Sequence, residues 1–392
     1  MSRTNWTAVW AVFAGGLVAG ACIGKVPPAL PALRTDFGLT LIETGYIATV
    51  LNIIGGVVGL FAGIVSDRFG HRRIALAGLA LMATGSLVGA VAPGYASLLA
   101  SRFLEGAGFI MMTVAGVALI AQTAAAGDRP RAMALWSCYL PAGGCLAMLA
   151  ASLALTTYGW RSLWLLLGAA AVACLALVAR AVPPRASVNR TLPLRLGADT
   201  LTHPASLLLC LVFAGYVAQW AALITWLPTF IVGERGGALL PAALLTALWV
   251  GINVPGVLLG GWLMARGARR SRIIVFASAV QALAASGALL DLLPDWGRYA
   301  SCLAFSFFGG IIPTAVFSGV AALAPSPQHI GTTNGMVMQV SQLVQFLSPI
   351  AVAWLATRLG WGAALPIMLG FAACAAAGGI AIAQIERSRM TA

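Results

Sequence analysis

The sequence predicts an all-α membrane protein with twelve transmembrane helices, arranged as two six-helix bundles. Of its 392 residues, 60% are hydrophobic and only 8% are charged, whereas a soluble domain carries about 25% charged residues. Apolar runs of about 20 residues, the length that crosses a bilayer, recur along the chain and are broken by Gly, Pro and Arg. A polar segment near the middle separates six of these runs from the other six.

The predicted helices follow these runs in order. The first six cover residues 6–33, 42–64, 74–92, 96–123, 132–155 and 162–182. The second six cover residues 205–231, 239–262, 273–292, 298–323, 332–356 and 361–384. The segment 183–204 contains four prolines, several arginines and no long apolar run, which indicates a cytoplasmic linker. We therefore expect an N-terminal bundle over 1–182, a linker over 183–204 and a C-terminal bundle over 205–392.

The distribution of basic residues supports this count and orients the helices. With both termini in the cytoplasm, sixteen arginines fall on the cytoplasmic side and five on the outer side, which are Arg34, Arg161, Arg235, Arg298 and Arg358. Cytoplasmic loops of membrane proteins carry such an excess of basic residues. The two remaining basic residues, Lys25 and Arg102, fall inside predicted helices. A shift of the count by one helix would remove this asymmetry.

Composition also excludes several classes of protein. The formal net charge of +13 does not indicate nucleic acid, because the arginines are scattered between apolar runs and form no basic stripe. Seven cysteines, an odd number without CxxC spacing, indicate neither disulfides nor a metal site. There is no GxxxxGK phosphate-binding loop and no nucleophile with a base beside it. We expect no enzyme activity and no cofactor.

The two halves of the chain contain related segments. GIVSDRFGHRR (63–73) follows the second predicted helix and GWLMARGARR (261–270) follows the eighth. YGWRS (158–162) precedes the sixth helix and LGWGA (359–363) precedes the twelfth. Two related six-helix halves are typical of secondary transporters, which bind substrate near the membrane midplane between the halves.

GIVSDRFGHRR resembles the signature loop of the major facilitator superfamily, G-x-x-x-D-R-x-G-x-R-R. The matching residues are Gly63, Asp67, Arg68, Gly70, Arg72 and Arg73. LLASRFLEGAG (98–108) is similar to the superfamily's fourth-helix motif, with Arg102, Gly106 and Gly108 in place and Glu105 where Gln is more usual. Two further segments, 134–144 and 223–236, resemble cyanate-permease-like and nitroimidazole-related transporters, but such segments recur in other branches.

The resemblance implies a fold, a mechanism and a gating role for the signature loop. We expect a monomer in the bacterial inner membrane, with both termini cytoplasmic, working by alternating access. In the family, the matching Asp faces the positive end of the eleventh helix, a contact worth about 0.3–1 kcal/mol at a surface. Asp67 would thus hold the cytoplasmic side shut, with Gly63 and Gly70 permitting close packing and a tight turn. Arg68, Arg72 and Arg73 would bind carboxylates or anionic lipid; for Arg72 and Arg73, setting the topology is an equal alternative.

Lys25, Arg102 and Glu105 place charge inside the membrane, which is costly and indicates function. At 1.5 Å per residue, Lys25 lies roughly 12 Å and Arg102 about 9 Å from the outer ends of their helices. Glu105 follows Arg102 at i+3, on the same helix face. One carboxylate between two cations leaves net positive charge, so we expect an anionic substrate bound by Lys25 and Arg102. Alternatively, Lys25 reaches the outer interface, Arg102 is structural, and Glu105 is either its structural partner or a proton carrier.

Polar and aromatic residues of the second half would complete the substrate site: Trp220, Asn253, Gln339 and Gln342. Hydrogen bonding between helices is the alternative role for the two glutamines. The sequence therefore predicts a transporter of a small organic or inorganic anion, coupled to protons, with the lipid bilayer as its surroundings. Efflux of amphipathic drugs or metabolites is one alternative, and a membrane receptor that binds without transporting is another.

Overall fold

A computed structural model describes residues 4–125, 128–184, 199–236, 238–290, 292–326 and 329–391. Within these ranges the chain is helical and contains no β-strand. The helices of the first half are α1 (Trp6–Gly24), α2 (Val26–Phe37), α3 (Leu41–Thr49), α4 (Leu51–Phe69), α5 (His71–Ala90), α6 (Tyr95–Thr123), α7 (Arg129–Ser137), α8 (Tyr139–Ala154) and α9 (Trp160–Ala181).

The second half continues the same pattern. Its helices are α11 (Pro204–Arg235), α12 (Leu239–Gly251), α13 (Asn253–Ala265), α14 (Arg270–Leu289), α15 (Asp295–Gly309), α16 (Ile311–Leu323), α17 (Ile330–Leu359), the short 3₁₀ helix η2 (Trp361–Ala363) and α18 (Ala364–Thr391).

These helices confirm the predicted fold class. In the described part of the chain, ten helical stretches are long and apolar enough to cross a membrane, and the apolar stretch Tyr139–Ala154 is shorter. The predicted second span corresponds to α3 and α4 together. The predicted count of twelve is therefore consistent with the structure. The first span runs further than expected, because the chain stays helical through Pro31 to Phe37.

Five predicted helices are each divided by a single residue. The division at Val50, between α3 and α4, has no proline near it, whereas prolines explain the other four. The dividing residues are Lys25, Cys138, Ile252 and Gly310, and in each case a proline follows three positions later, at Pro28, Pro141, Pro255 and Pro313. A proline has no N–H to donate to the carbonyl four residues earlier, and its ring crowds that carbonyl. That earlier residue is small at all four breaks: Gly24, Ser137, Gly251 and Gly309.

Prolines without a small residue four positions earlier do not interrupt their helices. Pro228 in α11 and Pro349 in α17 lie inside continuous helices, and Ile224 and Gln345 stand four positions before them. Glycine in a helix interior costs about 1 kcal/mol relative to alanine. The combination of proline and a small residue four positions earlier thus accounts for four of the five divisions, but not for the one at Val50.

The helices group into two compact units. Unit 1 contains residues 1–191 and 224–251, and unit 2 contains residues 192–223 and 252–392. The expected linker falls mostly on residues 185–198, which lie outside the described ranges. The division at 183–204 therefore stays a prediction.

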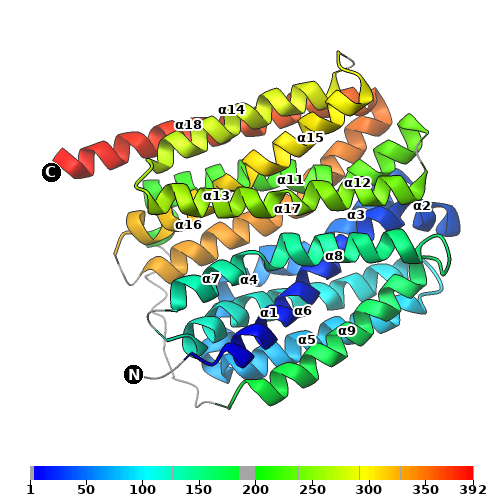
Figure 1. The fold of residues 1–392 in the computed structure, drawn as a ribbon, viewed down its shortest axis with the longest axis horizontal. Helices are drawn as coiled ribbons and strands as arrows, with labels where there is room; N and C mark the ends of the chain where they lie inside the picture. Colours follow the sequence, from blue (N-terminus) through cyan, green and yellow to red (C-terminus); the bar gives the residue numbers. More distant parts are fainter. Residues whose placement is uncertain are drawn as a thin grey trace. The chain divides into compact units, whose positions relative to one another are not determined.

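Close contact between α5 and α6 organises unit 1. A methyl group added at Gly108 would lie 2.4 Å from the carbonyl oxygen of Gly78, and one added at Gly78 would lie 2.8 Å from that of Gly108. Small residues at such crossings let two membrane helices approach closely. Around this crossing, α1 packs against α6, α8 and α9 to form one apolar core. In unit 2, α14 lies along both α15 and α18 (Figure 1).

Candidate functional site

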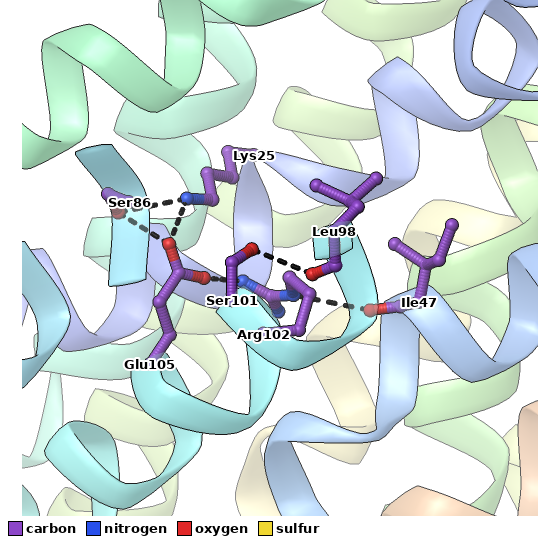
Figure 2. Close-up of polar contacts among 7 residues, drawn as sticks. All are labelled: Lys25, Ile47, Ser86, Leu98, Ser101, Arg102 and Glu105. Atoms are coloured by element: carbon purple, nitrogen blue, oxygen red, sulfur yellow. Dashed lines mark hydrogen bonds and ion pairs between the residues drawn. The ribbon is translucent and has the colours of Figure 1, made fainter. Parts of the chain in front are cut away.

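The break between α1 and α2 positions Lys25 at the centre of a charged cluster in unit 1. We call Lys25, Ser86, Arg102 and Glu105 the charged cluster (Figure 2). Lys25 lies at the α1–α2 junction, Ser86 lies on α5, and the other two residues lie on α6. Lys25 is only 1% exposed, and Arg102 and Glu105 are 0% exposed. The alternative that Lys25 reaches the outer interface is therefore wrong, because its ammonium group points into the unit.

Three groups surround the ammonium of Lys25. Its Nζ lies 2.5 Å from Oε1 of Glu105 and donates to Oγ of Ser86 at 3.0 Å. It also lies 4.3 Å from the ring centre of Trp164, a buried residue of α9. A cation over an aromatic face is worth about 2 kcal/mol when both are desolvated. Lys25 is thus fixed by three different helices.

Arg102 connects the cluster to a neighbouring helix. Its Nη1 donates to Oε2 of Glu105, one turn along α6, as the i,i+3 spacing predicts. Its Nε donates to the backbone carbonyl of Ile47 in α3 at 3.2 Å (Figure 2). Its Nη2 is buried and has no hydrogen-bond partner among the described residues. One donor of the guanidinium therefore stays available.

Glu105 bridges the two cations with separate oxygens. Oε1 accepts from Lys25 and from the hydroxyl of Ser86, the latter at 2.5 Å, while Oε2 accepts from Arg102. The backbone packs tightly around this carboxylate, since a methyl group at Gly85 would lie 2.7 Å from Cγ of Glu105. The geometry thus assigns each charged group of the cluster to at least one opposite charge.

The cluster carries two positive charges and one negative charge. Desolvating each ion costs several kcal/mol, and only close opposite charges with good hydrogen bonds offset that cost. Here one carboxylate serves two cations, so one positive charge remains without its own counter-ion. A buried site with this excess attracts anions and resists the approach of cations.

The signature loop lies at the junction of α4 and α5. Gly70 adopts φ 90°, a conformation that glycine reaches without strain, and so permits the turn into α5. Arg72 donates to the carbonyls of Val182 and Ala179 at 2.6 and 2.7 Å, at the carboxyl end of α9. A cation at this end of a helix is favourable. Arg73 is exposed, and the surroundings of Gly63 and the side chains of Asp67 and Arg68 lie outside the described part of the structure.

The remaining predicted residues belong to unit 2. Asn253 on α13 donates to the carbonyl of Ser306 at 2.8 Å and to the hydroxyl of Tyr216 at 3.4 Å. Gln342 on α17 accepts from Gln345 of the same helix at 2.9 Å, so this bond does not join two helices. Trp220 is buried in α11. Gln339 on α17 is partly exposed. Asn253 is thus joined to the backbone of Ser306 and to the hydroxyl of Tyr216, both of which are buried residues.

Sequence reasoning missed Ser86 and Trp164 as partners of Lys25. Ser86 stands out only as a hydroxyl inside an apolar helix, and Trp164 only as an aromatic residue in another. Among the described residues, no group of three or more His, Cys, Asp or Glu side chains could bind a metal ion.

With this geometry established, the comparison with known sequences is decisive. The sequence profile of the Major Facilitator Superfamily matches residues 12–349. The chain belongs to the Major Facilitator Superfamily. It is 25% identical over 347 residues to the 3-(3-hydroxy-phenyl)propionate transporter of Escherichia coli (strain K12), an alignment that covers 86% of this chain and 84% of that protein.

Two further relatives extend the range of this superfamily match. The niacin transporter NiaP of Acinetobacter baylyi (strain ATCC 33305 / BD413 / ADP1) is 22% identical over 316 residues, 71% of each chain. The cephamycin export protein CmcT of Amycolatopsis lactamdurans is 31% identical over 138 residues, 35% of this chain and 28% of that protein.

A solved structure shows the superfamily fold. The crystal structure of a D-xylose–proton symporter matches with a TM-score of 0.77 and 16% identity, covering 95% of this chain and 97% of the symporter. Relatives and structural neighbours alike are transporters. This chain is therefore a multi-pass membrane transporter and not an enzyme.

Proposed function

We propose that this transporter moves a small carboxylate anion across the bacterial inner membrane by alternating access, coupled to protons. The single observation that carries the proposal is the buried charged cluster, in which Glu105 balances only one of two cations. At an effective dielectric constant of 20, a unit charge about 10 Å away is attracted by about 1.7 kcal/mol, a preference of roughly fifteenfold.

The names of the relatives support a carboxylate as substrate. Over most of its length the chain is similar to transporters of 3-(3-hydroxy-phenyl)propionate and of niacin, and both compounds are aromatic acids. A carboxylate suits the free Nη2 of Arg102, because a guanidinium presents planar donors that match carboxylate oxygens. Lys25 and Arg102 would thus supply the positive field.

The other predicted residues complete the proposed cycle. Trp220, Asn253, Gln339 and Gln342 would line the substrate site from the second half of the chain. The signature loop of Gly63, Asp67, Arg68, Gly70, Arg72 and Arg73 would hold the cytoplasmic side closed while two six-helix bundles, 1–182 and 205–392, rock about the site. Glu105 would link the cluster to the proton. We place the transporter as a monomer with both termini in the cytoplasm.

Efflux is the second candidate, and one observation favours it. The cephamycin export protein is more identical to this chain than the acid transporters, although over only about a third of the chain. In that case the cluster would be structural, and substrates would be amphipathic rather than acidic. A receptor that binds without transporting would show no flux at all.

Transport in proteoliposomes tests the proposal. The probes are radiolabelled 3-(3-hydroxyphenyl)propionate and niacin, with uptake followed under an inward proton gradient and compared with a neutral amphipathic dye. We expect uptake of at least one acid that falls at least tenfold in Lys25→Ala and in Arg102→Ala. Arg161→Ala is the matched control, because its side chain is about half exposed and its ion pair with Asp36, at 3.6 Å, lies outside the charged cluster.

Each contrary outcome has a separate meaning for this proposal. Uptake of acids that survives both cluster substitutions contradicts binding through the charged cluster. Transport of the dye without transport of either acid supports efflux instead. Size-exclusion chromatography of every variant in detergent ensures that a loss of flux is not a loss of folding.

A further inference from the structure

The charged cluster contains three ionic side chains. Only one of them can gain or lose a proton at a low cost in electrostatic free energy. Arg102 stays charged at any physiological pH. Protonation of Glu105 would leave Lys25 and Arg102 as two buried cations without a counter-ion, since Glu105 is the carboxylate that both contact. Loss of a proton from Lys25 instead leaves the Arg102–Glu105 ion pair intact and makes the whole cluster neutral.

The hydrogen bonds of Lys25 permit this change. A lysine ammonium has three N–H donors, and two acceptors, Oε1 of Glu105 and Oγ of Ser86, lie within hydrogen-bond distance of Nζ. The remaining neighbour is the ring of Trp164, 4.3 Å away. A neutral amine keeps two N–H groups, enough for both acceptors, and gives up only the interaction of charge with the ring.

Among the residues that the structure describes, no other charged group around Lys25 compensates for the excess charge. The titratable or charged groups that face it are Glu105 and Arg102 from α6 and Cys22 from α1, which is a buried free thiol. α5 and α9 contribute the hydroxyl of Ser86 and the indole of Trp164. Burial of an ion without its own counter-ion favours the neutral form of that group.

We propose that Lys25, held by Glu105 and Ser86, is the residue that carries the exchanged proton. This rests on the proton coupling in the proposed function and deepens it, since Glu105 then acts by holding Lys25 rather than by binding the proton itself. In the described conformation the proton is occluded, because Lys25 is 1% exposed. Gain and loss of this proton switch the cluster between one positive charge and none.

The composition of the chain offers a direct test. Of the 23 basic residues, 22 are arginines, so Lys25 is the single lysine. Protein labelled with ¹³Cε/¹⁵Nζ-lysine therefore gives one side-chain resonance, which reports the charge on this Nζ without any substrate. We expect it to move from the ammonium position to the amine position at a lower pH than the value near 10.4 at which an ordinary lysine changes.

Variants separate this proposal from its alternatives. Cys22→Ser should leave the titration in place, because the thiol is not the group that changes. Glu105→Gln should shift it by at least one pH unit toward acid, since the stabilising carboxylate is gone. A resonance that stays at the ammonium position up to pH 10 in the wild-type protein overturns the proposal, whether or not carboxylates are transported.

A transport measurement adds a second decision. Lys25→Arg keeps the positive charge and the contact with Glu105 but cannot release a proton. We expect exchange of labelled for unlabelled 3-(3-hydroxyphenyl)propionate to continue, while accumulation driven by a pH gradient falls at least tenfold. Gradient-driven accumulation at the wild-type level in Lys25→Arg contradicts the proposal. Failure of the wild-type protein to transport any acid counts against the proposed function alone, and the resonance of Lys25 then decides this inference.

Discussion

The two halves of the chain bury polar side chains on corresponding helices but with opposite chemistry. In unit 1, the first, third and fourth predicted helices bring together Lys25, Ser86, Arg102 and Glu105, three of which are ionic. In unit 2, the corresponding helices α11, α14 and α15, with α13, contain Tyr216, Gln281, Ser306 and Asn253, all neutral. We call these four residues the amide cluster.

The two clusters also differ in how well their hydrogen bonds are satisfied. In the charged cluster, both carboxylate oxygens of Glu105 and the hydroxyl of Ser86 are bonded, and among the polar side-chain atoms of this cluster only Nη2 of Arg102 has no partner in the described part of the chain. In the amide cluster, Gln281 is fully buried and neither its Nε2 nor its Oε1 has a hydrogen-bond partner in the described part of the chain. Charges demand partners in an apolar interior, whereas a neutral amide is tolerated at a cost of about 1–3 kcal/mol. The ionic side chains of the two clusters therefore all belong to unit 1.

The largest expected effect comes from removing the shared carboxylate. Glu105→Gln leaves two buried cations without a counter-ion, and we expect it to lower the free energy of unfolding by about 3–5 kcal/mol. Equilibrium unfolding by urea in detergent micelles, followed by circular dichroism, measures the change. Glu43→Gln is the control, because Glu43 is partly exposed and caps a helix with Thr40, and its loss should cost about 1 kcal/mol or less. A cost below 1 kcal/mol for Glu105→Gln would show that the two clusters are energetically alike.

A pair of buried serines sharpens the comparison at a smaller scale. Ser86→Ala removes a hydroxyl that bonds both Lys25 and Glu105, and hydrogen bonds to charged groups are worth about 1.5–3 kcal/mol. Ser306→Ala removes an equally buried hydroxyl that has no hydrogen-bond partner among the described residues. In the same unfolding assay, we expect a loss of about 2 kcal/mol for the first and almost none for the second. Equal losses would contradict the difference between the clusters.

The smallest expected effect has the opposite sign. Gln281→Leu replaces a buried, unsatisfied amide by an apolar side chain of similar size, so we expect stability to rise by about 1 kcal/mol. Asn253→Leu is the matched control, because that amide is bonded to the carbonyl of Ser306 at 2.8 Å and its loss should destabilise. Destabilisation by Gln281→Leu would mean that the amide of Gln281 contributes to the folded state after all.

Much of this architecture follows from local sequence. Apolar runs located the helices, and the i,i+3 spacing of Arg102 and Glu105 predicted their ion pair, because one helix face is a property of a few neighbouring residues. The breaks at Lys25, Cys138, Ile252 and Gly310 follow from the spacing of proline and a small residue, which is a local pattern of the sequence. Features that depend on only a few neighbouring residues can thus be predicted from the sequence.

The partners of Lys25 could not be predicted from local sequence in this way. Ser86 and Trp164 lie far from it in sequence, and their contacts depend on how α5 and α9 pack against the first helix. The sequence left open that Lys25 reaches the outer interface, whereas the chain continues as α2 and the side chain turns inward. Tertiary packing decides which side of a kink a long side chain takes, and no local pattern encodes it.

The proline breaks have a consequence for movement. The carbonyl oxygens of Gly24, Ser137, Gly251 and Gly309 cannot receive an amide hydrogen from the fourth residue onward, because that residue is a proline in each case. Inside the hydrocarbon of a membrane, a helix normally resists bending because backbone hydrogen bonds connect each turn to the next. Four long helices therefore each lack a backbone hydrogen bond at the break. Their two segments bend there at lower energetic cost than a fully hydrogen-bonded helix would. Lys25 lies at one of these breaks, between α1 and α2, so its surroundings change whenever the helix bends there.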